Sequence, residues 1–159
     1  MTREEIAEKL FKEDGYNCSQ SVCLAFKDIA GIDERTLLNL SAPFGGGMGR
    51  LREVCGAVSG MFTVLGFLTD SSDPKNSEAK KELYEKVQNL AGKFKEENGS
   101  IICRELLGLS VKSEAPVPEK RSEDYYKKRP CLEMVKSAVR ILEKELDDSL
   151  KKGYIRKKL

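Results

Sequence analysis

Apolar residues recur every three or four positions along most of this 159-residue chain, which is the spacing that one face of an α-helix requires. Few segments show the alternation of apolar and polar residues that a β-strand needs. One hydrophobic core can serve a chain of this length. We therefore predict an all-α fold, a compact bundle of about six or seven helices without a sheet, in which residues 1–159 form a single domain.

Capping signals predict where the first helices begin. Thr2 and Glu5 have the spacing of a capping box, in which each side chain binds the backbone N–H of the other residue. Asn17 and Gln20 have the same spacing before the second apolar segment. Asp33 is placed to cap a short third helix.

The middle of the chain predicts three more helices. A glycine-rich turn over residues 43–49 leads into an apolar helix over residues 55–68. Residues 77–97 have the pattern of a long amphipathic helix. Ser100 then predicts the cap of a short helix that carries Cys103.

The last third of the chain predicts a loop, a helix and a tail. Residues 110–129 hold two prolines and many charges, so we expect a surface loop with at most one helical turn near Tyr125. Pro130 is well placed as the first residue of a final helix. Residues 150–159 are predicted to form a flexible basic tail.

The composition limits the partners of the chain. A hydrophobic content of 40% with 34% charged residues is typical of a soluble globular protein. A net charge of +2 gives no reason to expect nucleic acid as a partner. The longest apolar stretch, residues 54–68, is too short for a membrane span, so we expect no membrane insertion. The start of the chain lacks the pattern of an export signal, which predicts a cytoplasmic protein.

The absence of histidine excludes several kinds of chemistry. Histidine is the usual general base near neutral pH, a common zinc ligand and the axial ligand of many haems. Thiolates, carboxylates, lysines and the backbone remain for chemistry. No acid–base constellation stands out among them, so the sequence assigns no catalytic residue.

Four cysteines fall at or near predicted helix starts: Cys18, Cys55, Cys103 and Cys131. The first turn of a helix carries unpaired N–H groups and the positive end of the helix dipole. A thiol in this position has a lowered pKa, which favours thiolate or metal-bound sulfur. The alternative is that these cysteines are small apolar core residues. That interpretation suits the fifth, Cys23, which lies in mid-helix.

The spacing of the cysteines narrows the choice of site. The sequence holds no CxxC pair, which disfavours a zinc knuckle and a thioredoxin-like dithiol. The cysteine runs of common ferredoxins are also absent. A shared site would therefore take one cysteine from each of four separate elements, which a compact bundle allows.

The glycine-rich turn suggests a binding role for backbone N–H groups. It lacks the lysine of a phosphate-binding P-loop and follows no strand. We expect the backbone of Gly45, Gly46, Gly47, Met48 and Gly49 to lie against an anionic sulfur site. Arg50, Arg52 and Arg104 are candidates for balancing negative charge near these sulfurs.

Four stretches of the sequence together carry a cysteine and glycine pattern: GYNCSQSV, FGGGMGRLREVCGAVSG, CRELLG and CLEMV, which begin at Gly15, Phe44, Cys103 and Cys131. In these stretches the chain resembles the C_GCAxxG_C_C family of redox-active proteins, which is named for its cysteine pattern. The stretches occur in order along most of the chain. The resemblance makes Cys18, Cys55, Cys103 and Cys131 the family cysteines and leaves Cys23 outside the pattern.

This family is similar to part of the split-Soret cytochromes, which combine c-type haems with an iron–sulfur cluster. The chain has no CxxCH motif, so no haem is expected. The resemblance implies that the four cysteines ligate an iron–sulfur cluster, [2Fe–2S] in type, for electron transfer with a redox partner protein. Two alternatives stay open: a thiol–disulfide protein or sensor without metal, and a helical interaction protein with a structural four-cysteine metal site. A homodimer through residues 54–68 and burial of these residues within one bundle are equally consistent with the sequence.

Overall fold

The computed structural model describes residues 1–110 and 113–152, and it builds this part of the chain from helices. The principal helices are α1 (Arg3–Lys12), α2 (Cys18–Ala25), α4 (Glu34–Ser41), α6 (Gly56–Leu68), α7 (Ser77–Asn98) and α10 (Cys131–Lys151). Short helices lie between them: α3 (Lys27–Ala30), η1 (Ala42–Phe44), α5 (Gly45–Met48), α8 (Cys103–Leu106) and α9 (Glu123–Lys128). The described residues form no strand and only an isolated β-bridge between Val54 and Ile102. The predicted all-α class is confirmed.

Side-chain caps start the first helices where the sequence predicts them. The Thr2 hydroxyl accepts from the Glu5 amide, and the Glu5 carboxylate accepts from the Thr2 amide. Asn17 and Gln20 form the same reciprocal pair at the start of α2. Asp33 caps α4 through the amide of Thr36. Each contact satisfies N–H groups that have no partner inside the helix.

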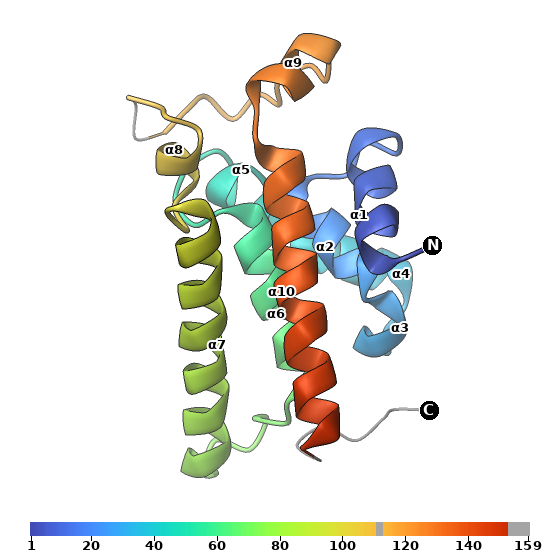
Figure 1. The fold of residues 1–159 in the computed structure, drawn as a ribbon, viewed down its shortest axis with the longest axis vertical. Helices are drawn as coiled ribbons and strands as arrows, with labels where there is room; N and C mark the ends of the chain where they lie inside the picture. Colours follow the sequence, from blue (N-terminus) through green and yellow to red (C-terminus); the bar gives the residue numbers. More distant parts are fainter. Residues whose placement is uncertain (111–112, 153–159) are drawn as a thin grey trace.

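The apolar helix α6 lies at the centre of the bundle. Figure 1 shows the long helices α7 and α10 side by side, and α6 packs against both of them and against α2. Its Val58, Val64 and Leu65 side chains are fully buried. Neighbouring helices of the same chain therefore cover much of this apolar stretch, and the homodimer stays a prediction. No described helix has the length and apolar character needed to cross a bilayer.

The start of α8 differs from the prediction. Ser100 is not its cap, because the extended Ile102 precedes the helix and pairs with Val54. The Ser100 hydroxyl instead accepts from the Ile102 amide at 3.0 Å and donates to the carboxylate of Glu105. Cross-chain pairing of this kind cannot be read from a local capping pattern.

The last helix also differs at its ends. Pro130 is the cap of α10 rather than its first helical residue. Leu150 and Lys151 belong to the helix, and Leu150 packs against the core, so the prediction of a flexible tail from residue 150 is wrong at these positions. Residues 153–159 of the predicted tail lie outside the described residues.

Candidate functional site

Each of the four predicted cysteines stands at the very start of a helix. Cys18, Cys103 and Cys131 are the first residues of α2, α8 and α10, and Cys55 is the cap of α6. Cys23 lies inside α2 and is fully buried in the apolar core, as predicted. The four helix starts converge at one end of the bundle.

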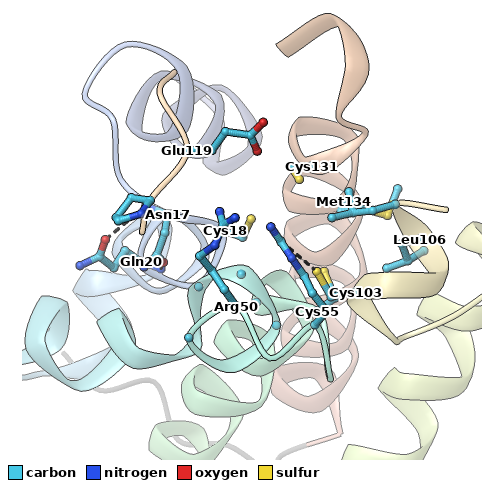
Figure 2. Close-up of a pocket in the computed structure, with 18 of the residues that line it drawn as sticks. Asn17, Cys18, Gln20, Arg50, Cys55, Cys103, Leu106, Glu119, Cys131 and Met134 are labelled. Carbon is cyan, nitrogen blue, oxygen red and sulfur yellow. Dashed lines mark hydrogen bonds between the residues drawn. The ribbon is translucent and has the colours of Figure 1, made fainter. Parts of the chain in front are cut away.

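All four cysteines line one cavity of about 590 Å³, which we call the cysteine cavity. Figure 2 shows Cys18, Cys55, Cys103 and Cys131 around this space. Gly45, Gly46, Gly47 and Gly49 of the predicted glycine turn also line it. Met48 is not among the lining residues, and 38% of its surface is exposed. The cavity therefore contains eight of the nine predicted site residues.

Backbone pairing brings Cys55 and Cys103 together although 48 positions separate them in the sequence. The amide of Cys55 donates to the carbonyl of Ile101 at 2.8 Å, and the amide of Cys103 donates to the carbonyl of Glu53. The amide of Arg104 donates to the carbonyl of Arg52 at 3.2 Å. These bonds hold the starts of α6 and α8 against each other.

The glycine turn approaches Cys103 closely because Gly47 has no side chain at the point of contact. Residues 46–50 have φ angles between 62° and 69°, a left-handed turn that L side chains rarely adopt. A Cβ atom on Gly47 would lie 2.6 Å from the Cβ of Cys103. A Cβ atom on Gly56 would lie 2.8 Å from the Phe44 carbonyl and 3.2 Å from the Cβ of Cys18. Glycine at these positions keeps the backbone within reach of the sulfur side chains.

The pKa values of the four thiols shift in different directions. The hydrogen bond from Cys18 lowers the pKa of Cys131 to about 7 against the effect of burial, and the charges of Arg129, Arg52 and Arg121 act in the same direction. The same thiol–thiol contact, together with burial, raises the pKa of Cys18 well above its ordinary value.

Burial dominates at the other two cysteines. It raises the pKa of Cys55 to about 12, although the amides of Ala57 and Val58 act to lower it. Burial also raises the pKa of Cys103, against the hydrogen bond and charge of Arg52. A lowered pKa is thus found at Cys131 alone, where Cys18 and nearby arginines cause it rather than the helix start. The expectation is wrong for the other three thiols, because the cavity removes them from water.

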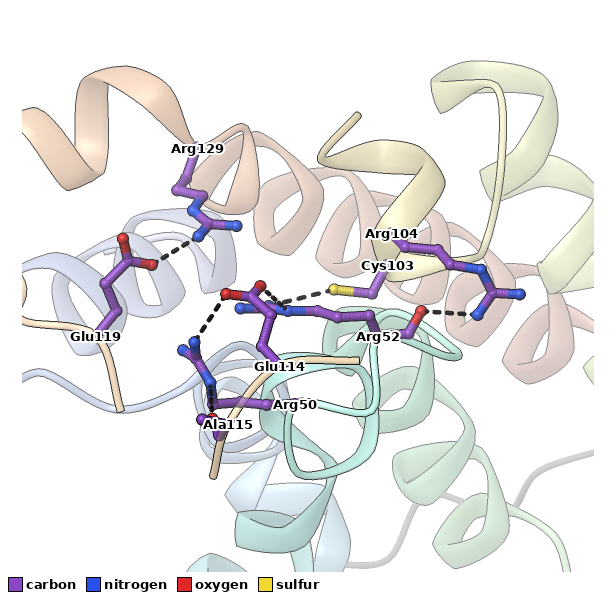
Figure 3. A network of polar contacts seen from close by, with 8 residues as sticks. All are labelled: Arg50, Arg52, Cys103, Arg104, Glu114, Ala115, Glu119 and Arg129. Carbon is purple, nitrogen blue, oxygen red and sulfur yellow. Dashed lines mark hydrogen bonds and ion pairs between the residues drawn. The ribbon is translucent and has the colours of Figure 1, made fainter. Parts of the chain in front are cut away.

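Arginines and glutamates form an ion-pair network beside the cavity. Arg50 and Arg52 both bind the carboxylate of Glu114, with N–O distances of 3.0 and 2.7 Å. Arg129 binds Glu119 at 2.6 Å (Figure 3). The predicted charge-balancing residue Arg104 instead forms an ion pair with Glu53 at 2.9 Å.

Arg121 has no carboxylate partner among its described contacts. Its guanidinium donates to the carbonyls of Phe11 and Tyr16 and lies over the Phe11 ring. Together with Arg50, Arg52 and Arg129 it makes four positive groups, against the carboxylates of Glu114 and Glu119. These six side chains leave the surroundings of the cavity with a positive charge excess of two.

Residues 113–122 supply three of the six charged side chains around the cavity, although the sequence predicted them only as part of a surface loop. Glu114 and Ala115 bind Arg50, and Pro116 and Pro118 line the cavity. Residues 113–122 therefore cover the cysteines rather than merely crossing the surface. No periodicity indicates this role, because the contacts join residues more than 60 positions apart.

The donor set of the cavity fits a sulfur-ligated metal centre in type and number, because four thiolates are what common iron–sulfur clusters require. Gly47 and Gly56 also let the backbone approach Cys103 and Cys18 more closely than a side chain at either position would allow. Within residues 1–110 and 113–152, however, no three His, Cys, Asp or Glu side chains are gathered tightly enough to hold a metal ion as they stand. All five cysteines are free thiols in the structure.

These features define a helical protein whose distinctive site is a cavity bordered by four thiols from separate helix starts. The chain belongs to the family described as "Putative redox-active protein (C_GCAxxG_C_C)", whose pattern matches residues 16–145. No curated protein and no solved structure is significantly similar to this chain. The family description suggests redox activity and names a cysteine pattern, without specifying the chemistry.

Proposed function

We propose that this chain binds an iron–sulfur cluster through Cys18, Cys55, Cys103 and Cys131 and transfers electrons to and from a partner protein. The observation that carries the proposal is the shared cavity: four sulfur ligands from four helix starts border one space of about 590 Å³. Cys23, which the same composition would offer as a ligand, lies away from it in the core. When bound, the cluster would supply one-electron transfer.

The surrounding charge favours this assignment. An oxidised cluster with four thiolate ligands is a dianion, and a buried charge needs compensation. The excess of two guanidinium groups over carboxylates around the cavity would provide it. The backbone of the glycine turn borders the same cavity, and N–H groups there would adjust the potential and stability of a bound cluster. A [2Fe–2S] centre is the type we propose.

Anaerobic reconstitution with iron and sulfide tests this proposal. We expect a brown protein whose absorption spectrum is that of a [2Fe–2S] centre, with iron and acid-labile sulfide in equal amounts. A colourless protein without iron would contradict the proposal. Stoichiometric zinc in protein purified without added metal would indicate the structural metal site instead.

A thiol–disulfide function is the second candidate, and one contact favours it. The Cys18 and Cys131 thiols interact, and this interaction lowers the pKa of Cys131 to about 7. The thiolate of Cys131 could attack a partner disulfide, and Cys18 would then release the partner as a dithiol and leave a Cys18–Cys131 disulfide. Two electrons and two protons pass to the partner in that exchange.

The metal-free, reduced protein should show this pKa in the alkylation of Cys131. We expect the rate with iodoacetamide to rise about tenfold per pH unit below pH 7 and to level off above it, because the thiolate is the nucleophile. Peptide mass spectrometry measures the rate at each cysteine. In Cys18→Ala the midpoint should move to higher pH, because the thiolate loses its donor. A wild-type midpoint at the pH of an ordinary free thiol would contradict the prediction.

A further inference from the structure

Arg52 is the residue that joins the glycine turn, the segment that covers the cavity and a cysteine. It has a φ of 57°, in the left-handed region, and only 7% of its side chain is exposed. Its amide donates to the carbonyl of Gly46 at 3.4 Å, and its carbonyl accepts from both the amide and the side chain of Arg104. These bonds hold the backbone of Arg52 on both sides.

The guanidinium of Arg52 donates to two different acceptors, a cysteine sulfur and a carboxylate. Its Nη1 donates to the Sγ of Cys103 at 3.6 Å, while its Nε donates to the carboxylate of Glu114 at 2.7 Å. Figure 3 shows Arg52 between the carboxylate and the sulfur. Arg50 binds the same carboxylate, but its side chain bonds to Glu114 and the carbonyl of Ala115 rather than to a sulfur. Among the described arginines that border the cavity, Arg52 is the one bonded to a cysteine.

We infer that Arg52 sets the reduction potential of the centre that Cys103 ligates, and that Glu114 moderates its effect. The inference rests on the proposed cluster function. One electron from the partner adds a negative charge to the site on reduction. A buried guanidinium with an N–H bond to a ligand sulfur stabilises the more negative state and so raises the potential. The Glu114 carboxylate acts in the opposite sense, because its charge opposes that added electron.

Two substitutions should therefore shift the midpoint in opposite directions. R52Q removes the positive charge, and we expect a lower midpoint potential than in the wild type. E114Q removes the opposing negative charge while Arg52 stays, and we expect a higher midpoint. R52K keeps the positive charge and should restore most of the wild-type midpoint. These signs distinguish charge tuning from general damage to the site, which would not produce a rise in E114Q.

A spectroelectrochemical titration of the anaerobically reconstituted proteins measures the midpoints, with iron and sulfide content determined on each sample. R140Q is the matched control, because Arg140 also pairs with carboxylates, Glu4 and Glu97, but on the α10 surface. Its midpoint should equal that of the wild type. An unchanged midpoint in R52Q would overturn the proposed role of Arg52. An unchanged midpoint in E114Q would overturn the proposed role of Glu114. If R52Q fails to fold, the direction of the midpoint shift in E114Q tests the proposal: a higher midpoint supports it and a lower midpoint overturns it.

The two proposals fail in different ways. A wild-type protein that takes up no iron or sulfide overturns the cluster function and, with it, the role of Arg52. A wild-type protein that holds a cluster whose midpoint is insensitive to both substitutions leaves the function intact and overturns only the present inference.

Discussion

Replacing Cys55 or Cys103 by alanine should abolish the binding of iron and sulfide, whereas Cys23→Ala should bind them as the wild type does. Cys55 and Cys103 line the cysteine cavity, and each would supply one of four ligands. Cys23 is a matched control because it is also a buried free thiol, but it lies in the apolar core. Iron and sulfide analysis of the reconstituted proteins, normalised to folded chain by circular dichroism, measures the effect.

The same variants separate the two candidate functions. Cys55 and Cys103 do not take part in the Cys18–Cys131 contact, so a thiol–disulfide protein would keep its redox pair in both variants. A cluster protein would lose its cofactor in either one. Cys55→Ala that retains the iron content of the wild type would contradict the four-ligand site. Loss of iron in Cys23→Ala without unfolding would show that the ligand set is wrongly assigned.

Gly47→Ala should cost about 2–5 kcal/mol of folding stability, because it combines a left-handed backbone with a steric clash. Gly47 has a φ of 67°, and an added Cβ would meet the Cβ of Cys103 at 2.6 Å and the Cα of Arg52 at 2.9 Å. Since these neighbours belong to the cavity, the substitution should also reduce cluster binding. Urea unfolding of the metal-free protein measures the stability change.

Gly108→Ala is the matched control for Gly47→Ala. Gly108 has a nearly identical φ of 65°, but nothing lies within 4 Å of the position of an added Cβ. We expect only the left-handed penalty there, about 1–2 kcal/mol. Equal losses of stability at the two positions would mean that the close packing of the glycine turn on Cys103 contributes nothing.

The features that could be predicted from the sequence are local ones. The Thr2–Glu5 and Asn17–Gln20 capping boxes depend on side chains three residues apart, and both form as predicted. Of the four cysteine helices, α2 begins at such a cap, whereas α6, α8 and α10 begin without a side-chain cap. To predict that the four cysteines come together, one must also assume that several helix starts meet at one end of the bundle. All four cysteines do line one cavity.

The features that could not be predicted depend on contacts between distant segments. Glu114 joins Arg50 and Arg52 across more than 60 residues, and no pattern in either segment indicates the pairing. The raised pKa of Cys55 also depends on distant segments. The amides at its helix start act to lower the pKa, but burial by the assembled bundle outweighs that effect. The predicted cap at Ser100 fails for the same reason, because the bridge between Val54 and Ile102 moves the start of α8 to Cys103.

X-ray absorption at the iron edge of the reconstituted protein tests the central claim most directly, because it reports the atoms bound to each iron. The account predicts a first shell of sulfur alone, with a second iron at the short distance typical of a [2Fe–2S] centre. A shell that contains oxygen or nitrogen ligands, or iron without a neighbouring iron, would contradict the claim that Cys18, Cys55, Cys103 and Cys131 together hold one cluster.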